Sequence, residues 1–166
     1  PEEDRGSLQP LAASILMSLL YAARVARFDL LRAVCSLASH ISKWTKTSDR
    51  RLLRIIRYVN ATAHFRQYGW IGDEPGSLAP HLYVDADLAG CPKTQHSTSG
   101  IHLNVEGPFS RFPCCGKSQK QTCTSTSTPE AEIVAAFMGH KMVLMPSLDV
   151  WDVLLPKDYR AIIHED

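Results

Sequence analysis

The sequence lacks the features of several large classes of protein. Its longest uncharged, mainly apolar run covers residues 11–23, which are too few to span a bilayer. The chain begins with the acidic and polar residues PEEDRG, so the sequence shows no signal peptide. Its five cysteines are an odd number without regular spacing, unlike the framework of a disulfide-stapled secreted domain. These absences predict an intracellular protein, cytoplasmic or nuclear and not secreted, that has no membrane partner.

The composition is that of a folded chain with two differently charged halves. Of 166 residues, 45% are hydrophobic and 21% are charged, which excludes disordered and collagen-like proteins. Residues 1–70 hold eleven Lys and Arg against five Asp and Glu, whereas residues 71–166 hold seven against twelve. This asymmetry predicts two segments with different tasks, covering residues 1–70 and 81–166, joined by a glycine- and proline-rich linker at 71–80.

The first segment has the residue pattern of helices. Good helix formers fill residues 11–40, as one helix or as two with a break at 27–29, and a second helical pattern starts with Ser48 or Asp49 as its N-cap. In that second pattern Arg50, Arg54 and Arg57 lie opposite a broad apolar face. The three arginines form a candidate nucleic-acid-binding stripe, although the solvated face of an amphipathic helix would look the same.

The second segment alternates with the period of strands and then changes to that of a helix. Strand-like runs cover residues 81–85, 101–105 and 109–115, with a hairpin turn at 106–108. Thr128 as N-cap and Pro129 as first helical residue predict a helix that ends near Pro146, followed by a further helical turn or two around residues 148–155. Residues 159–164 look like a buried strand. Three strands, a helix and a strand predict an α/β fold with a hairpin sheet and one crossover.

Acidic residues close two of these strands and open the helix between them. They are Asp85 and Asp87, Glu130 and Glu132, and Glu165 and Asp166. A right-handed crossover would make the first and last strands neighbours, which would bring these ends together at one rim of the sheet. Clustered carboxylates suit a hard cation such as Mg²⁺ and indicate metal-assisted phosphodiester hydrolysis. Capping and solubility are the alternative explanation for acids at such positions.

Four short motifs add a family resemblance. They occur in the order YVDADLAG (83–90), STSG (97–100), SQKQ (118–121) and STPEAE (127–132). These motifs resemble those of the ribonuclease H domain at the end of the Pol polyprotein of copia-type LTR retrotransposons. Upstream, SLLYAARVARFDL (18–30) and RLLRIIRYVNAT (51–62) are similar to the region of that polyprotein between the reverse-transcriptase thumb and ribonuclease H.

The resemblance implies a fold and an activity. The fold is a ribonuclease H-like mixed sheet, truncated after the fourth strand and preceded by a helical segment. The activity is hydrolysis of the RNA strand of RNA–DNA hybrids with two Mg²⁺ (or Mn²⁺) ions, for which Asp85, Glu132 and Asp166 match the catalytic and metal-binding carboxylates. Lys117 and Lys120 are candidate phosphate contacts. The implied partners are the hybrid and the rest of the polyprotein, including reverse transcriptase, within a retroelement particle.

The sequence also departs from the family pattern. Leu88 replaces a tryptophan, Phe28 replaces a proline, and Pro113 falls inside a predicted strand, where it favours an edge or a break. The family's fourth metal ligand has no counterpart before the last residue. Two alternatives to an active enzyme therefore stay open: a non-catalytic nucleic-acid-binding remnant, and a decayed retroelement fragment without function.

Overall fold

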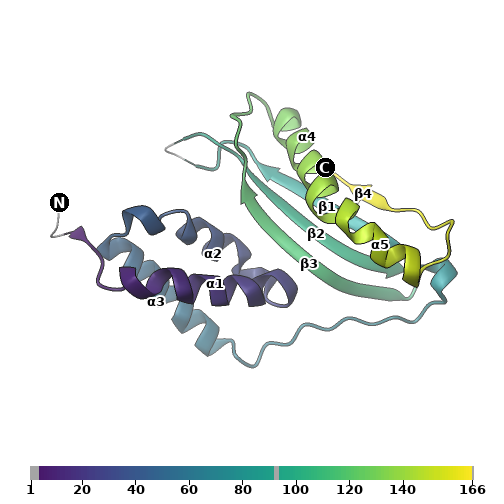
Figure 1. Cartoon of the computed structure of the whole chain (residues 1–166), viewed down its shortest axis with the longest axis horizontal. Helices are drawn as coiled ribbons and strands as arrows, with labels where there is room; N and C mark the ends of the chain where they lie inside the picture. Colours follow the sequence, from purple (N-terminus) through teal and green to yellow (C-terminus); the bar gives the residue numbers. More distant parts are fainter. Residues whose placement is uncertain (1–3, 92–93, 166) are drawn as a thin grey trace. The chain divides into compact units, whose positions relative to one another are not determined.

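The computed structural model describes residues 4–91 and 94–165 (Figure 1). The chain divides into two compact units, residues 1–67 and 68–166. The first unit is helical, and the second combines a four-stranded mixed sheet with helices. The protein is therefore a mixed α/β protein, and each unit is described by itself below.

Three α-helices and two short 3₁₀ turns form the first unit. They are α1 (Gln9–Val25), η2 (Phe28–Leu30), α2 (Leu31–Ala38), η3 (Ile41–Lys43) and α3 (Lys46–Ala61). The turn η2 interrupts the apolar stretch that the sequence left as one helix or two, so the chain forms two helices there. Buried side chains from all three helices, including Leu16, Val34 and Leu52, share one hydrophobic core.

The start of α3 corrects the predicted N-cap. The cap is Thr45, whose Oγ1 accepts the N–H of Ser48 while the Ser48 hydroxyl accepts the N–H of Thr45, both at 3.3 Å. This reciprocal capping box satisfies two N–H groups of the first turn, which an N-cap at Ser48 or Asp49 would leave unbonded. Asp49 instead accepts the indole N–H of Trp44 at 2.6 Å and the N–H of Ser7 at 2.7 Å, so it fixes the N-terminal segment to α3.

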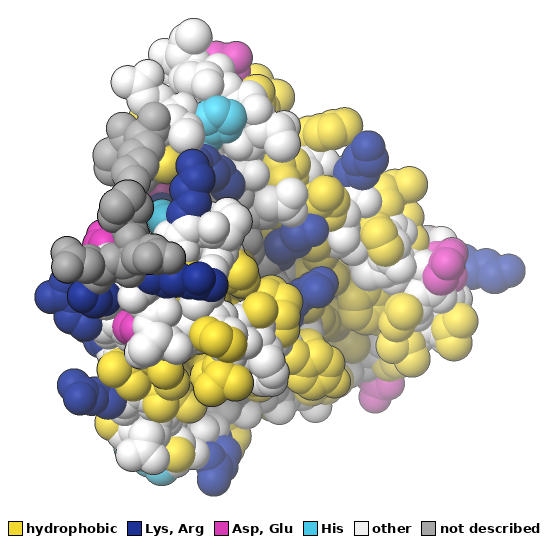
Figure 2. Space-filling view, turned by 60° about the vertical axis from the view of Figure 1, so that its left-hand side comes forward, with side chains coloured by type: hydrophobic (Ala, Val, Ile, Leu, Met, Phe, Trp, Pro, Cys, Tyr) yellow, Lys and Arg dark blue, Asp and Glu magenta, His cyan; other side chains and the backbone are white. Residues whose placement is uncertain are grey.

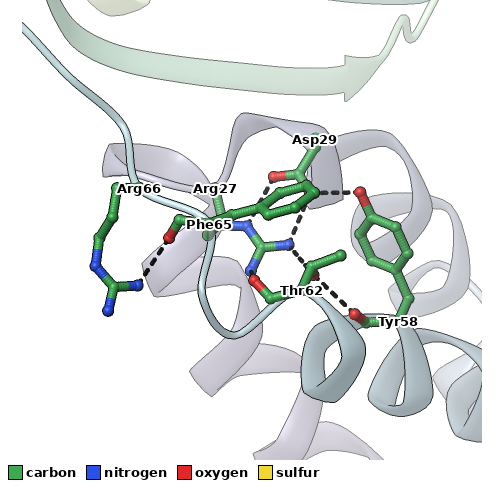
Figure 3. Close-up of polar contacts among 6 residues, drawn as sticks. All are labelled: Arg27, Asp29, Tyr58, Thr62, Phe65 and Arg66. Atoms are coloured by element: carbon green, nitrogen blue, oxygen red, sulfur yellow. Dashed lines mark hydrogen bonds and ion pairs between the residues drawn. The ribbon is translucent and has the colours of Figure 1, made fainter.

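A polar network joins the turn η2 to the end of α3 (Figure 3). Arg27 donates two hydrogen bonds to Asp29, at 3.0 and 2.8 Å, and a third to the Thr62 hydroxyl at 2.8 Å. The Tyr58 hydroxyl donates to the same carboxylate at 3.0 Å. The hydrogen bond from Arg27 lowers the pKa of Asp29. Arg27 and Asp29 lie in the upstream motif of residues 18–30, so that motif has a structural role here.

Four strands form the sheet of the second unit, in the order β3-β2-β1-β4. They are β1 (Ala79–Asp87), β2 (Thr98–Gly107), β3 (Ser110–Lys120) and β4 (Ile162–His164). The pairs β1–β2 and β2–β3 are antiparallel, and β1–β4 is parallel. The first three strands are longer than predicted. The fourth keeps only three of its six predicted residues, and Ile162 and Ile163 in it are exposed, not buried as predicted. Pro113 lies in β3, an edge strand, where a break in register near Asn104 accommodates it.

One long helix covers one face of the sheet (Figure 1). It consists of α4 (Thr128–Gly139), a π-helical turn η5 (His140–Leu144) and α5 (Met145–Leu154). Its N-cap is Ser127 rather than the predicted Thr128. The predicted end at Pro146 is wrong, because this proline stands in the first turn of α5, directly after the π turn. A wider turn before proline gives its ring room that a regular α-helix lacks.

The covered face of the sheet holds the hydrophobic core of this unit. Alternate residues of β1 and β2, including Leu82, Val84 and Leu103, pack against Ala131 and Ala135 of α4. Gly139 permits this close packing, because a Cβ there would lie 2.7 Å from Cγ1 of Val84.

The continuous helix Thr128–Leu154 is also long and apolar enough, by length and composition alone, to cross a membrane.

The first residues of the predicted linker are attached to the sheet. Trp70 and Arg111 exchange two backbone hydrogen bonds of 3.0 Å. The Ser110 hydroxyl accepts the N–H groups of Gly72 and Asp73, at 2.9 and 3.0 Å, and the Asp73 carboxylate accepts the N–H of Phe109 at 2.8 Å. These bonds place residues 70–73 in the second unit.

Candidate active site

The predicted catalytic carboxylates come from β1 and α4. Asp85 lies near the end of β1 with an exposed side chain, and among the described residues its carboxylate has no hydrogen-bond partner. Glu132 lies in the first two turns of α4 and is only 7% exposed. Asp166 lies outside the described residues. The last residues of β4, up to His164, pair with β1 as far as Tyr83.

Glu132 is bound to the strand that carries Asp85. Its Oε1 accepts the backbone N–H of Ala86 at 3.2 Å, across 46 residues of sequence. On its other side Ala86 faces Ser99 of β2, and β4 pairs with β1 only from His81 to Tyr83. The Glu132 carboxylate therefore occupies the edge of β1 beyond the end of β4. This bond brings the two predicted carboxylates to consecutive residues of one strand.

The other acids of the two motifs have separate structural partners. Asp87 accepts the N–H of Thr98 and so closes the connection between β1 and β2. Glu130 accepts the N–H and the hydroxyl of Thr126, at 2.7 and 2.8 Å, and these two bonds lower its pKa. Within each acidic pair, one member thus stabilises a turn or a helix start, and the other is Asp85 or Glu132.

The donors at this edge are compatible in type with a hard cation. Asp85 and Glu132 supply carboxylate oxygens, and Mg²⁺ in proteins commonly takes one or two carboxylates, with water and phosphate oxygens completing its shell. Within residues 4–91 and 94–165, no group of three or more His, Cys, Asp and Glu residues is arranged to hold a metal ion. Both donors are thus of the type that a hard cation takes, and Asp85, which alternates with Ala86, belongs to the face of β1 that α4 does not cover.

The three arginines predicted to bind nucleic acid share one helix, α3. Arg50, Arg54 and Arg57, here called the arginine ridge, are exposed at helical spacing. Arg50 donates to the Thr47 hydroxyl at 3.1 Å, and the ridge forms no ion pair with any described residue. In Figure 2, exposed Lys and Arg side chains lie among exposed hydrophobic ones on the face shown. The ridge is thus available to an anionic partner.

The structure does not bring the two predicted lysines together. Lys117 pairs with Ile101 and Lys120 with Thr98, so they lie on opposite faces of β3. The Lys117 ammonium lies 3.2 Å from the sulfur of Met142, and the Lys120 ammonium lies 3.0 Å from the sulfur of Cys91. Each lysine has its own local contact, and the pair does not form one phosphate site.

A polar cluster on the second face of the sheet escaped the sequence interpretation. The Tyr83 hydroxyl donates to Glu106 at 3.2 Å, Asn104 donates to the same carboxylate at 2.7 Å, and the rings of Tyr83 and His164 stack at 4.2 Å. Burial raises the pKa of Glu106, but the hydrogen bonds from Asn104 and Tyr83 outweigh it, and the net shift is downward. The available signal was the alternation of His81, Tyr83 and Asp85 along β1.

Comparison with known proteins gives one informative relative. The chain is 30% identical to secreted RxLR effector protein 161 of Plasmopara viticola over 122 residues, which are 74% of this chain and 81% of that protein. The chain belongs to the family of this RxLR effector protein. No family model and no solved structure matches the chain.

Membership in the RxLR effector 161 family corrects the predicted location. The sequence predicted an intracellular protein that is not secreted, whereas the name of the relative states that it is secreted. The prediction rested partly on the cysteines, and none of the five forms a disulfide in the structure. The state of the cysteines does not report on export, so that inference was wrong.

Proposed function

We propose that this protein binds nucleic acid and hydrolyses the RNA strand of RNA–DNA hybrids, and that its sequence derives from a copia-type Pol polyprotein with a ribonuclease H-like domain. The observation that carries the proposal is the hydrogen bond from Ala86 to Glu132, which brings the motif glutamate to the residue next to the motif aspartate. The burial of Glu132 also supports the proposal, because a nearly buried carboxylate at a helix start costs free energy unless another interaction compensates its lost hydration.

The proposal gives each carboxylate a task. Asp85 is exposed and offers both oxygens, whereas Glu132 is nearly buried and is oriented by the N–H of Ala86. With Asp166 they would hold Mg²⁺ or Mn²⁺, two ions in the family pattern, which activate the attacking water and stabilise the leaving oxygen when bound. The arginine ridge would contact backbone phosphates and give binding a strong salt dependence.

The decisive experiment is cleavage of a labelled RNA–DNA hybrid by the full chain, with Mg²⁺ or Mn²⁺ and with EDTA. We expect metal-dependent cleavage of the RNA strand that falls at least about 100-fold in Asp85→Asn and in Glu132→Gln, because each removes a charged metal ligand. Glu130→Gln is the matched control, since it neutralises the neighbouring acid that binds only Thr126. Absence of cleavage by a cooperatively folded wild-type chain would refute the proposed activity.

A second candidate function, a secreted effector, is favoured by the relative. We propose this location and role because the relative aligns with three quarters of this chain. The nuclease chemistry does not exclude it. The test is detection of the native protein in the culture medium of the organism that produces it, against a cytosolic marker. Its confinement to the cells that produce it would contradict this candidate.

A further inference from the structure

The side chain of Gln121 lies at the centre of the contacts around the candidate site. It follows the last residue of β3 and is 1% exposed. Its Nε2 donates to the Ser99 hydroxyl at 3.0 Å and to the Ala131 carbonyl at 2.9 Å, while its Oε1 accepts the Ser125 hydroxyl at 3.4 Å. A buried amide that uses both ends in this way fixes the groups around it.

The two groups that receive Nε2–H bonds flank the Glu132 contact. Ser99 is the residue of β2 directly opposite Ala86, and Ala131 directly precedes Glu132 in α4. The amide of Gln121 and the carboxylate of Glu132 therefore join the same two parts of the fold, the middle of the sheet and the first turns of α4. Any shift of α4 relative to β1 would strain both links together.

We propose that Gln121 is a positioning residue for Glu132: it holds the start of α4 so that the carboxylate stays on Ala86 beside Asp85. This inference deepens the proposed function and rests on it for its catalytic meaning. The residue type follows from the geometry, because only an amide of this length offers two N–H donors and one acceptor here. A glutamate would face the Ala131 carbonyl with oxygen, and a methionine would leave the Ser99 and Ala131 acceptors and the Ser125 donor unbonded.

The test compares Gln121→Met with Asn104→Leu in the full chain. Asn104 is the matched control, since it is 2% exposed in the same sheet but donates to Glu106 on the opposite face. The readouts are amide hydrogen exchange at Ala86 relative to Leu103, Mg²⁺ affinity from NMR shifts, and the separation of kcat from KM in hybrid cleavage. Neither the Gln121 side chain nor the Asn104 side chain forms a hydrogen bond with Ala86.

For Gln121→Met we expect exchange at Ala86 to rise about tenfold more than at Leu103, and Mg²⁺ affinity and kcat to fall about 10- to 100-fold, as for other groups that orient metal ligands. Asn104→Leu should change Ala86 and Leu103 alike. Equal changes at both amides in Gln121→Met, or unchanged Mg²⁺ affinity, would overturn the inference. If the wild-type chain binds Mg²⁺ but cleaves nothing, while Ala86 still responds, then the proposed activity fails and the positioning role stands.

Discussion

The helical unit and the sheet unit join residues at different distances along the chain. In the helical unit, the Arg27 network connects residues 35 apart and Asp49 binds Ser7 across 42, but most other bonds lie within one helix or turn. In the sheet unit, Ala86 meets Glu132 across 46 residues and His81 meets His164 across 83. The first unit is thus specified largely by local sequence, whereas the candidate site of the second exists only once distant strands and a helix have assembled.

The units also differ in charge. Residues 1–67 hold eleven Lys and Arg and five Asp and Glu, a net charge of +6, whereas residues 68–166 carry a net charge of −5. A basic surface attracts a nucleic acid without help, but an acidic site repels it unless a cation intervenes. The proposed division of labour, binding by one unit and metal-dependent chemistry by the other, follows from this difference.

The largest expected effect tests whether the two units are stable independently. Leu52 in α3 and Leu82 in β1 are both 0% exposed, and replacing either by alanine should destabilise its own unit by about 2–5 kcal/mol. Hydrogen exchange followed by mass spectrometry during denaturant unfolding would resolve the units. If Leu52→Ala destabilised residues 68–166 as much as residues 4–67, the division into independent units would be wrong.

The next effect separates the role of the arginine ridge in the first unit from that of positive charge in the second. Replacing Arg50, Arg54 and Arg57 together by glutamine should weaken binding to duplex nucleic acid about tenfold or more and flatten its salt dependence by about three counterions. Fluorescence anisotropy across a salt series would measure both. The control replaces Lys141, Lys157 and Arg160 together by glutamine, which removes three positive charges from the second unit. Equal losses in both triple variants would show that net charge, rather than the ridge, drives binding.

A smaller effect compares the two helix starts. Thr45→Ala breaks a reciprocal capping box, while Ser127→Ala removes one bond of 3.4 Å to the N–H of Glu130. Each substitution should lower the free energy of unfolding of its unit by about 1 kcal/mol, and Thr45→Ala should lower it more. Chemical denaturation of each unit provides the measurement, and serine at position 45 should restore most of the loss. A larger loss from Ser127→Ala would reverse the expected order.

The smallest effect is a pH dependence in the helical unit. Because Arg27 lowers the pKa of Asp29 in the folded state, this pair stabilises the unit above the unfolded carboxyl pKa of about 4. The contribution is lost as the pH falls through the folded pKa, and partial exposure of Asp29 keeps it below about 1 kcal/mol. Urea unfolding at pH 5 and pH 2.5 should show a smaller difference for Asp29→Asn than for wild type. An identical difference in the two proteins would show that Asp29 does not contribute to unfolding by acid.

Local patterns predicted the centres of the elements better than their ends. The apolar periodicity of residues 52–59 and the alternation of 101–105 correspond to α3 and β2, since these patterns reflect burial on one face. The cap at Thr45 was missed because several polar residues there compete for the same role. The continuity of the helix through Pro146 was missed because a π turn is not visible in residue spacing.

The candidate site was predictable only in part. The motifs identified Asp85 and Glu132 but could not show that Ala86 joins them, which depends on β4 ending at His164 and leaving the edge of β1 open. Without the motifs, the positions of these acids at strand and helix ends gave Asp87 and Glu130 the same standing as Asp85 and Glu132. Their bonds to Thr98 and Thr126 distinguish them, and such bonds follow from tertiary structure rather than from residue type.

The short strand β4 has a consequence for the order of folding. Its three residues pair in parallel with β1 after an intervening stretch that includes the whole of β2, β3 and the long helix. Closing so long a loop for so few backbone bonds costs entropy that only a preformed sheet and helix can offset. The hairpins of β1, β2 and β3 should therefore form first and β4 last, so that the rim of the candidate site is completed at the final step of folding.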